Sequence, residues 1–255
     1  MKFNNIEVFN FEGALRGMRN PKESWERSDT KTIHVSHEWC IDNSYLPLGN
    51  GNYICIGPND MKLAQTLILA GPEHAKFLRQ IFVSVDITAP LYWWKEFDTY
   101  KVGTTANSTS TMHKIASKPI TLDCFEISDY RMSLPMIDGI NLGARVDYFV
   151  ESLEQLRQLH LYYIEQSKQD GITEAEKTEY RELAKWYWKE MIRWLPEGWF
   201  QTRTVTMSYA NLRNMRSQRK THKQTEWSID FMNFIDSLPY AEEFIKIERT
   251  DADAV

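Results

Sequence analysis

Residues 208–227 read SYANLRNMRSQRKTHKQTEW, and this stretch predicts where the last long helix of the chain begins. Immediately before it, residues 199–207 alternate apolar and polar side chains as a strand does. Ser208 is a residue type that caps helix N-termini, so we expect the helix to start there and to end before Pro239. The stretch therefore predicts a strand that leads directly into a helix.

One face of this predicted helix is basic. Steps of three and four residues bring together the side chains that we call the basic stripe, namely Arg213, Arg216, Arg219, Lys220 and Lys223. No Asp or Glu occurs from Tyr209 to Thr225, so these cations have no acidic partner nearby in the sequence. A solvated charged face is the ordinary interpretation of such a stripe. Its position near a helix N-terminus favours a binding site for a small anion equally well.

A hydroxyl-rich segment lies earlier in the chain. Residues 100–114 read YKVGTTANSTSTMHK, with six hydroxyl side chains from Thr104 to Thr111. This composition is typical of a linker, of a glycosylated loop, or of a cradle for a polar ligand. Hydroxyls and the backbone N–H groups around Gly103 can hold a phosphate without contributing charge. Together with the basic stripe, the segment suggests a site for a nucleotide-type anion.

The amino-acid composition and the net charge limit the classes of protein to which the chain can belong. The 255 residues are 42% hydrophobic and 13% aromatic, which is ample for a sizeable buried core. A net charge of −5 argues against nucleic acid or an anionic membrane as a partner of the whole protein. The N-terminus lacks an apolar signal core, and no run approaches the roughly 20 apolar residues of a membrane span. We therefore expect a soluble, cytoplasmic protein.

The cysteines and histidines do not predict a metal site. Cys40, Cys55 and Cys124 are widely spaced, without a CxxC pair, and are expected to be buried thiols. The six His residues form no HExxH motif, so we expect no metal.

The chain shows no internal repeat and no long linker, so we expect residues 1–255 to form a single domain. Its successive parts are N-terminal strands with a polar segment (1–57), a helix–strand region with the hydroxyl-rich segment (58–144), an αα-hairpin (145–195), a strand with the basic helix (196–240), and a tail (241–255).

Hydrophobic periodicity places the elements within these parts. Strands are expected in residues 6–11, 52–56 and 82–87, and helices in residues 57–71, 72–81 and 91–100. The last of these helices carries Trp93 and Trp94, which are either core residues or platforms for a base or flavin.

The αα-hairpin is expected to consist of helices over residues 145–167 and 174–195. Thr173 and Glu176 form a predicted capping box at the start of the second helix. His160 lies on the apolar seam and is expected to be a core or interface residue.

Two segments of the chain resemble the flavin-dependent thymidylate synthases. That family carries a signature of the form RHRxxSxNExSxRY, and TTANSTSTMH resembles its second half, with Asn107 on the Asn and Ser110 on the second Ser. A later family helix has the form NARxLxHFxxLR, and SYANLRNMRSQR resembles it, with Leu212 on the Leu and Arg219 on the final Arg. THKQTEW then resembles the family's AQxEIR-like ending, and WLP at 194–196 resembles its LP turn.

The chain departs from the family pattern at several charged positions. The RHR triplet falls on Tyr100, Lys101 and Val102, and the signature's Glu falls on Ser108. Its last Arg and Tyr fall on Met112 and His113. On the later helix, the family's Asn, Arg and His fall on Ser208, Ala210 and Asn214.

The resemblance implies an α/β (α+β) protein with the thymidylate-synthase-complementing fold, which has a mixed or antiparallel sheet, long helices and an αα-hairpin. It implies a homotetramer that binds FAD and dUMP, with NADPH and methylenetetrahydrofolate as co-substrates. The residues expected to contact the nucleotide are Lys101, Asn107, Ser108, Ser110, Arg216 and Arg219, where Arg216 rests on the helix-face argument. The residues expected near the cofactor are His113, Ser208, Asn214 and His222.

Two functions of different class follow from these observations. One is a divergent flavin-dependent enzyme that acts on dUMP or a related pyrimidine nucleotide. The other is a protein of the same fold that binds a nucleotide or a protein partner without catalysis. No nucleophilic Cys or Ser–His–Asp arrangement can be read from the spacing, so no catalytic residue is assigned, and a cofactor would have to supply the difficult chemistry.

Overall fold

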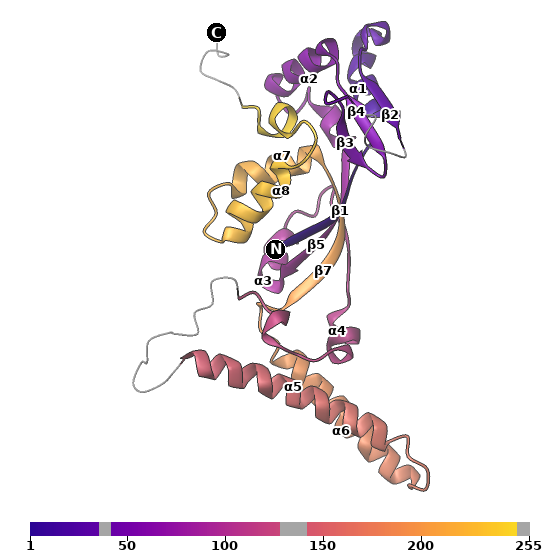
Figure 1. Ribbon diagram of the computed structural model, residues 1–255, viewed down its shortest axis with the longest axis vertical. Coiled ribbons are helices and arrows are strands. Elements are labelled where there is room, and N and C mark those ends of the chain that lie inside the picture. Colours follow the sequence, from indigo (N-terminus) through magenta and orange to yellow (C-terminus); the bar gives the residue numbers. More distant parts are fainter. Residues whose placement is uncertain (36–41, 128–141, 249–255) are drawn as a thin grey trace. The chain divides into compact units, whose positions relative to one another are not determined.

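The computed structural model describes residues 1–35, 42–127 and 142–248 (Figure 1). Its contacts divide the chain into two compact units, each of which is described here by itself. Unit 1 comprises Met1–Thr88, Glu96–Asn107 and Arg203–Val255, and unit 2 comprises Ala89–Lys95 and Ser108–Thr202. That the whole chain is a single domain stays a prediction.

The larger sheet has the strand order β1-β5-β7-β6. Its strands are β1 (Lys2–Phe9), β5 (Phe82–Pro90), β7 (Phe200–Ser208) and β6 (Thr105–Ser108). β5 forms because β-branched residues alternate along it, and Val83, Val85 and Ile87 are fully buried. β1 pairs with β5 in antiparallel register, with one irregularity between Asn4 and Glu7. The mixed α and β fold with antiparallel pairing confirms the expected fold class.

A second, three-stranded antiparallel sheet lies in unit 1. Its order is β2-β4-β3, with β2 at Lys31–His34, β4 at Asn52–Cys55 and β3 at Leu46–Gly49. The helices nearest in sequence are α1 (Phe11–Arg19) and α2 (Pro58–Ala70). Short 3-10 turns occupy Asn20–Lys22 and Trp25–Arg27.

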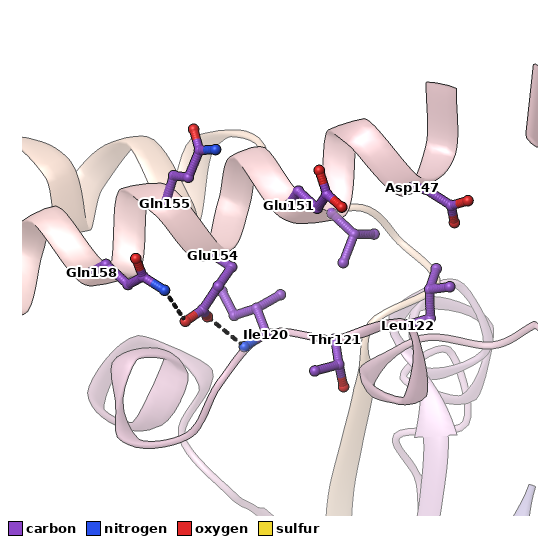
Figure 2. A pocket seen from close by; sticks show the side chains of 9 residues that line it. Ile120, Thr121, Leu122, Asp147, Glu151, Glu154, Gln155 and Gln158 are labelled. Carbon is purple, nitrogen blue, oxygen red and sulfur yellow. Dashed lines mark hydrogen bonds between the residues drawn. The ribbon is translucent and has the colours of Figure 1, made fainter. Parts of the chain in front are cut away.

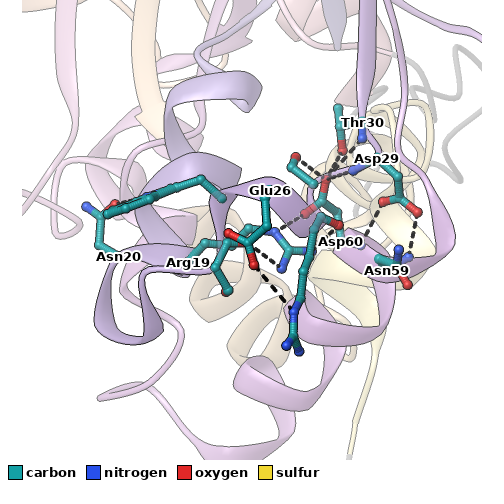
Figure 3. Close-up of polar contacts among 11 residues, drawn as sticks. Arg19, Asn20, Glu26, Asp29, Thr30, Asn59 and Asp60 are labelled. Atoms are coloured by element: carbon teal, nitrogen blue, oxygen red, sulfur yellow. Dashed lines mark hydrogen bonds and ion pairs between the residues drawn. The ribbon is translucent and has the colours of Figure 1, made fainter.

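A buried ion pair connects α1 to α2 (Figure 3). Arg19 Nε lies 2.6 Å from Asp60 Oδ1, and both side chains are almost fully buried. The other oxygen of Asp60 accepts bonds from Ser28 and from the backbone and hydroxyl of Thr30. Burial alone would raise the pKa of Asp60, but the bonds from Thr30, Ser28 and Arg19 outweigh it and lower that pKa. The network fixes the polar segment after α1 against the start of α2.

Residues 72–81 do not form the helix that the sequence predicts. Only a 3-10 turn is present, at Lys76–Arg79. The turn places Phe77 and Leu78 in the core, so the burial of apolar side chains is satisfied without a full α-helical turn.

The last long helix is also shorter than predicted. α7 ends at Arg219, and a π-helical segment at Glu226–Phe231 and α8 at Met232–Asp236 follow after a break. The polar run from Lys220 to Thr225 offers no apolar side chain to hold a continuous helix against the core.

The first residues of the predicted tail are structured. Ala241–Lys246 form a second π-helical segment, in which Phe244 and Ile245 are buried. Phe244 packs edge-on against Phe77 at a ring separation of 5.9 Å. The remaining residues of the predicted tail, 249–255, lie outside the described part of the chain.

Unit 2 contains the predicted αα-hairpin, formed by α5 (Leu142–Gln166) and α6 (Glu174–Arg193) (Figure 1). The capping box of Thr173 and Glu176 is confirmed by both of its hydrogen bonds. His160 Nδ1 lies 2.8 Å from the carbonyl oxygen of Ala184 on the facing helix. His160 therefore lies in the seam between the two helices.

The rest of unit 2 consists of short elements. α3 (Leu91–Phe97) begins in this unit, α4 covers Thr111–Lys114, and 3-10 turns cover Ile115–Ser117 and Leu122–Cys124. Trp93 and Trp94 are buried against each other, with ring centroids 4.9 Å apart, so they are core residues. No helix in the described ranges is both long and apolar enough to cross a membrane.

Candidate functional site: a groove beside helix α7

A concavity of unit 1 lies beside α7 (Tyr209–Arg219) and has a volume of about 1100 Å³. We call it the α7 groove. Four parts of the chain line it: the end of α2 and the following turn (68–82), the turn at 102–103, α7 with its cap (208–217), and the segment that contributes Ile245 and Glu248. The groove therefore combines the basic helix with an apolar wall.

The start of α7 is fixed by its cap. The Ser208 hydroxyl accepts a hydrogen bond from the Asn211 backbone N–H, and Asn211 Oδ1 accepts one from the Ser208 backbone, 3.1 Å away. The predicted cap is confirmed. Because the Ser208 hydroxyl already holds the helix, its expected contact with a cofactor stays a prediction.

Asn211 also holds the turn that forms one rim of the groove. Its Nδ2 donates to the Val102 carbonyl oxygen at 2.7 Å. Gly103 follows with φ of +77°, and an added Cβ there would lie 3.0 Å from Asn211 Oδ1. A glycine is thus required both by the backbone conformation and by the close approach of Asn211.

The cations of α7 have partners that lie outside the helix. Arg213 donates to the Ile245 carbonyl oxygen at 2.9 Å, and burial lowers the pKa of its guanidinium. Arg216 Nη1 lies 3.5 Å from Glu248 Oε1, and Lys220 Nζ lies 3.0 Å from the same oxygen. The hydrogen bond from Lys220 lowers the pKa of Glu248. The absence of local acids, observed in the sequence, is therefore offset by a glutamate from the C-terminal segment.

Arg219 and His222 lie together in a separate cluster. Arg219 Nε donates to the Tyr100 hydroxyl at 2.8 Å, and its guanidinium is ion-paired with Glu96. The same guanidinium lies 4.9 Å from the ring centroid of Trp227. His222 Nε2 is 3.3 Å from Glu96. Both predicted site residues thus share one carboxylate inside unit 1, and their contacts with a ligand stay predictions.

The hydroxyl-rich segment contributes one strand to the larger sheet. Residues 105–108 form the exposed strand β6, and Ser110 caps the short helix α4. The Ser110 hydroxyl lies 2.7 Å from His113 Nδ1. Asn107 and the exposed Lys101 belong to unit 1, whereas Ser108, Ser110 and His113 belong to unit 2.

Of the ten predicted site residues, the structure brings Ser208, Asn214 and Arg216 together in the α7 groove.

Several residues of the groove were missed by the sequence interpretation. Glu248 and Ile245 lie in the segment taken as a tail, and the apolar wall includes Ile68, Leu78 and Phe82. The one local signal was Asn211, which stands three residues after Ser208 in the position of a capping box.

Unit 2 has a smaller hollow of about 570 Å³ between α5 and residues 120–122 (Figure 2). Glu154 lines it and accepts a hydrogen bond from the Ile120 backbone N–H at 2.7 Å. Arg157 binds both oxygens of Glu154, and its hydrogen bonds are the largest cause of a Glu154 pKa lowered to about 2. This carboxylate joins two parts of the unit and is already saturated with donors.

Comparisons with known proteins find the fold of the chain among solved structures. No family model matches the sequence, and no curated protein matches it. A crystal structure of the flavin-dependent thymidylate synthase ThyX from Helicobacter pylori, complexed with FAD and dUMP, matches at a TM-score of 0.56 and 16% identity. The match covers 98% of this chain and 100% of that one.

A second crystal structure of ThyX from Helicobacter pylori, also with FAD and dUMP, matches at a TM-score of 0.55 and 17% identity. It covers 96% of this chain and 97% of that one. At such identities the likeness concerns the path of the backbone, and it extends over nearly the whole chain. The chain therefore has the fold of the flavin-dependent thymidylate synthases.

Proposed function

We propose that this protein binds a pyrimidine deoxynucleotide of the dUMP type in the α7 groove. The observation that carries the proposal is the pairing of an arginine-bearing wall with an apolar wall in one concavity. Arg213 and Arg216 suit a phosphate, because guanidinium groups donate paired hydrogen bonds to its oxygens. Phe82, which also lines the groove and is 38% exposed, suits the face of a base.

The family resemblance and the fold support this location. The family's arginine on this helix falls on Ala210, which lines the groove. Arg213 and Arg216 follow about one and two turns further along the same helix. We infer that these two arginines take over the anion-binding role of the residue that Ala210 replaces.

The groove also fits a flavin dinucleotide by size and charge. Its volume of about 1100 Å³ exceeds the range of about 300–1,000 Å³ that is usual for ligand sites. In that case the FAD diphosphate, in place of the dUMP phosphate, would lie near Arg213 and Arg216, and Asn214 offers an uncharged donor in the same groove. Bound FAD would supply redox chemistry that no side chain in the groove provides. NADPH and methylenetetrahydrofolate belong to the same proposal as co-substrates.

The protein's own contribution would be binding and orientation. The Asn211–Val102 hydrogen bond fixes the rim of the groove, and the cap at Ser208 fixes the arginines relative to that rim. The ion pair of Arg219 with Glu96 supports the end of the same helix. Such a fixed site raises affinity by reducing the ordering cost of binding.

The test is a calorimetric titration of the purified protein with dUMP. Arg216→Ala is expected to weaken dUMP binding about tenfold or more, because a hydrogen bond to a charged group contributes about 1.5–3 kcal/mol. Lys223→Ala is the matched control, since it removes an exposed cation of the basic stripe that does not line the groove. Equal losses in both variants, or none in either, would reject the groove as the nucleotide site.

The non-catalytic alternative is favoured by one specific observation. The cationic RHR triplet of the resembled signature falls on Tyr100, Lys101 and Val102, and Val102 is 88% exposed at the groove rim. The visible absorption spectrum after addition of FAD and desalting separates the two functions. A retained flavin band would support the enzyme, and dUMP binding by a colourless protein would support the binding protein.

A further inference from the structure

A carboxylate from the C-terminal segment lies against the cations of α7. Glu248 Oε1 is 3.0 Å from Lys220 Nζ and 3.5 Å from Arg216 Nη1. Arg216 and Lys220 are four residues apart, so one turn of helix places both on the same face. Glu248 lines the groove together with Arg213 and Arg216. One acidic oxygen thus sits between two cations at a site proposed to receive an anion.

The segment that precedes Glu248 is anchored by its packing against α7. Ala241–Lys246 pack on α7, and the side chains of Phe244 and Ile245 are buried. Arg213 donates to the Ile245 carbonyl oxygen at the end of that segment. Glu248 follows Ile245 by three residues, which limits its reach to about 10 Å. The glutamate is therefore held near the groove even when its ion pairs are broken.

The cations themselves do not require a ligand. Basic residues in the last turn of a helix complement its dipole, and Arg216 and Lys220 lie at the C-terminal end of α7. What points to a ligand is their convergence on a single oxygen of Glu248, a residue that lines, together with Arg216, a groove with space for a larger group. Glu248 is exposed, with 60% of its side chain accessible to solvent, so water and dissolved anions can compete with it for the two cations.

We propose that Arg216 and Lys220 form a phosphate subsite in which the Glu248 carboxylate stands in for the phosphate of the ligand. A phosphomonoester binds there by displacing Glu248, so the C-terminal segment competes with the nucleotide for the same cations. This inference rests on the proposed function, because it assigns the phosphate end of the same ligand. It adds Lys220 to the binding residues and gives Glu248 the role of an internal competitor.

The first test removes the competitor. Glu248→Gln keeps the size of the side chain and deletes its charge, so dUMP and inorganic phosphate are both expected to bind about two- to tenfold more tightly at low ionic strength. This range corresponds to the loss of two ion pairs made by an exposed carboxylate. Added salt should reduce the gain, since both the ion pairs and the ligand contact are screened.

Glu242→Gln is the matched control for net charge. Glu242 lies on the same segment and is exposed, but it pairs with Lys246 and does not line the groove. Its replacement should leave phosphate and dUMP affinity unchanged. If Glu248→Gln tightens binding no more than Glu242→Gln does, the competition is refuted and only a general charge effect remains.

A second variant tests the subsite itself. Lys220→Ala in the Glu248→Gln background is expected to weaken dUMP binding about two- to fivefold, because one exposed cation–phosphate contact is lost. An unchanged affinity would remove Lys220 from the subsite.

The failure of this inference is distinguishable from that of the proposed function. If the wild-type protein binds dUMP through Arg216 and Glu248→Gln changes nothing, the function stands and the competitor role is overturned. If neither the wild-type protein nor Glu248→Gln binds dUMP or phosphate, both are overturned. Binding by Glu248→Gln alone would support both.

Discussion

At the scale of single residues, the structure separates arginines that resemble one another in the sequence. Arg216 lies in the groove with an exposed glutamate as its partner. Arg219, three residues later, is enclosed by Glu96, Tyr100 and the ring of Trp227. Helical spacing alone placed both on one basic face. Arg219 is held by side chains more than 100 residues earlier in the chain and Arg216 contacts a glutamate 32 residues later, and no local pattern reveals either partner.

Arg219 is consequently expected to contribute to stability. Arg219→Ala removes an ion pair that is mostly shielded from water, a hydrogen bond and a cation–π contact, and leaves Glu96 without its guanidinium partner. We expect the free energy of unfolding to fall by about 1–3 kcal/mol. Urea unfolding monitored by tryptophan fluorescence measures this loss, with the exposed Lys223→Ala as control. An unfolding midpoint equal to that of the wild type would show that the cluster contributes little and would favour the ligand role alone.

At the scale of elements, the sequence correctly predicted the helices, strands and caps whose defining pattern lies within their own residues. The alternation in β5, the apolar seam of α5 and α6, and the caps at Thr173 and Ser208 all appear as expected. The errors occur where tertiary contacts decide the outcome. Phe77 and Leu78 reach the core from a 3-10 turn, and the apolar residues beyond α7 pack from π-helical segments, whose period differs from that of the α-helix.

The attachment of α5 depends on the charge of Glu154. Its pKa, lowered to about 2 chiefly by the hydrogen bonds from Arg157, lies below the value in the unfolded chain. The stabilisation is therefore present above the unfolded pKa of about 4.3 and is lost as pH falls towards 2. Glu154→Gln should lower the free energy of unfolding at pH 7 by about 1–3 kcal/mol, and the difference from wild type should shrink in acid.

Urea unfolding at pH 7 and at pH 2.5 measures this effect, and Glu151→Gln serves as control. Glu151 lines the same hollow one turn earlier on α5 and is exposed (Figure 2). A loss that is equal at both pH values would mean that Glu154 acts through packing and not through its charge.

At the scale of the whole molecule, the site could be predicted only in part. The α7 groove is built from residues 68–82, 102–103, 208–217 and 245–248, which are far apart in the sequence. The basic stripe and Gly103, both noted in the sequence, belong to two of these four parts. The apolar wall and Glu248 could not be found in the same way, because a buried helix end and a polar tail carry no mark of a binding site until the chain is folded.

The oligomeric state is the remaining prediction at this scale. The resemblance implies a homotetramer, and α5 offers apolar surface that an assembly could cover. Tyr148 and Tyr162 are 71% and 54% exposed. Their spacing of 14 residues is about four helical turns, so they lie on one face. We expect sedimentation of the wild-type protein to give about four times the chain mass of 30.1 kDa.

A double variant, Tyr148→Lys with Tyr162→Lys, should shift that species towards smaller ones, because like charges on a shared face repel and desolvating them is costly. Leu161→Lys is the control, since it adds a charge at an exposed position of the same helix that lies about 100° or more around the helix axis from both tyrosines. If the double variant sediments as the wild type does while Leu161→Lys dissociates, the contact lies on the other side of α5. A wild-type protein that sediments as a monomer would contradict the assembly, and the exposed tyrosines would then be ordinary surface residues.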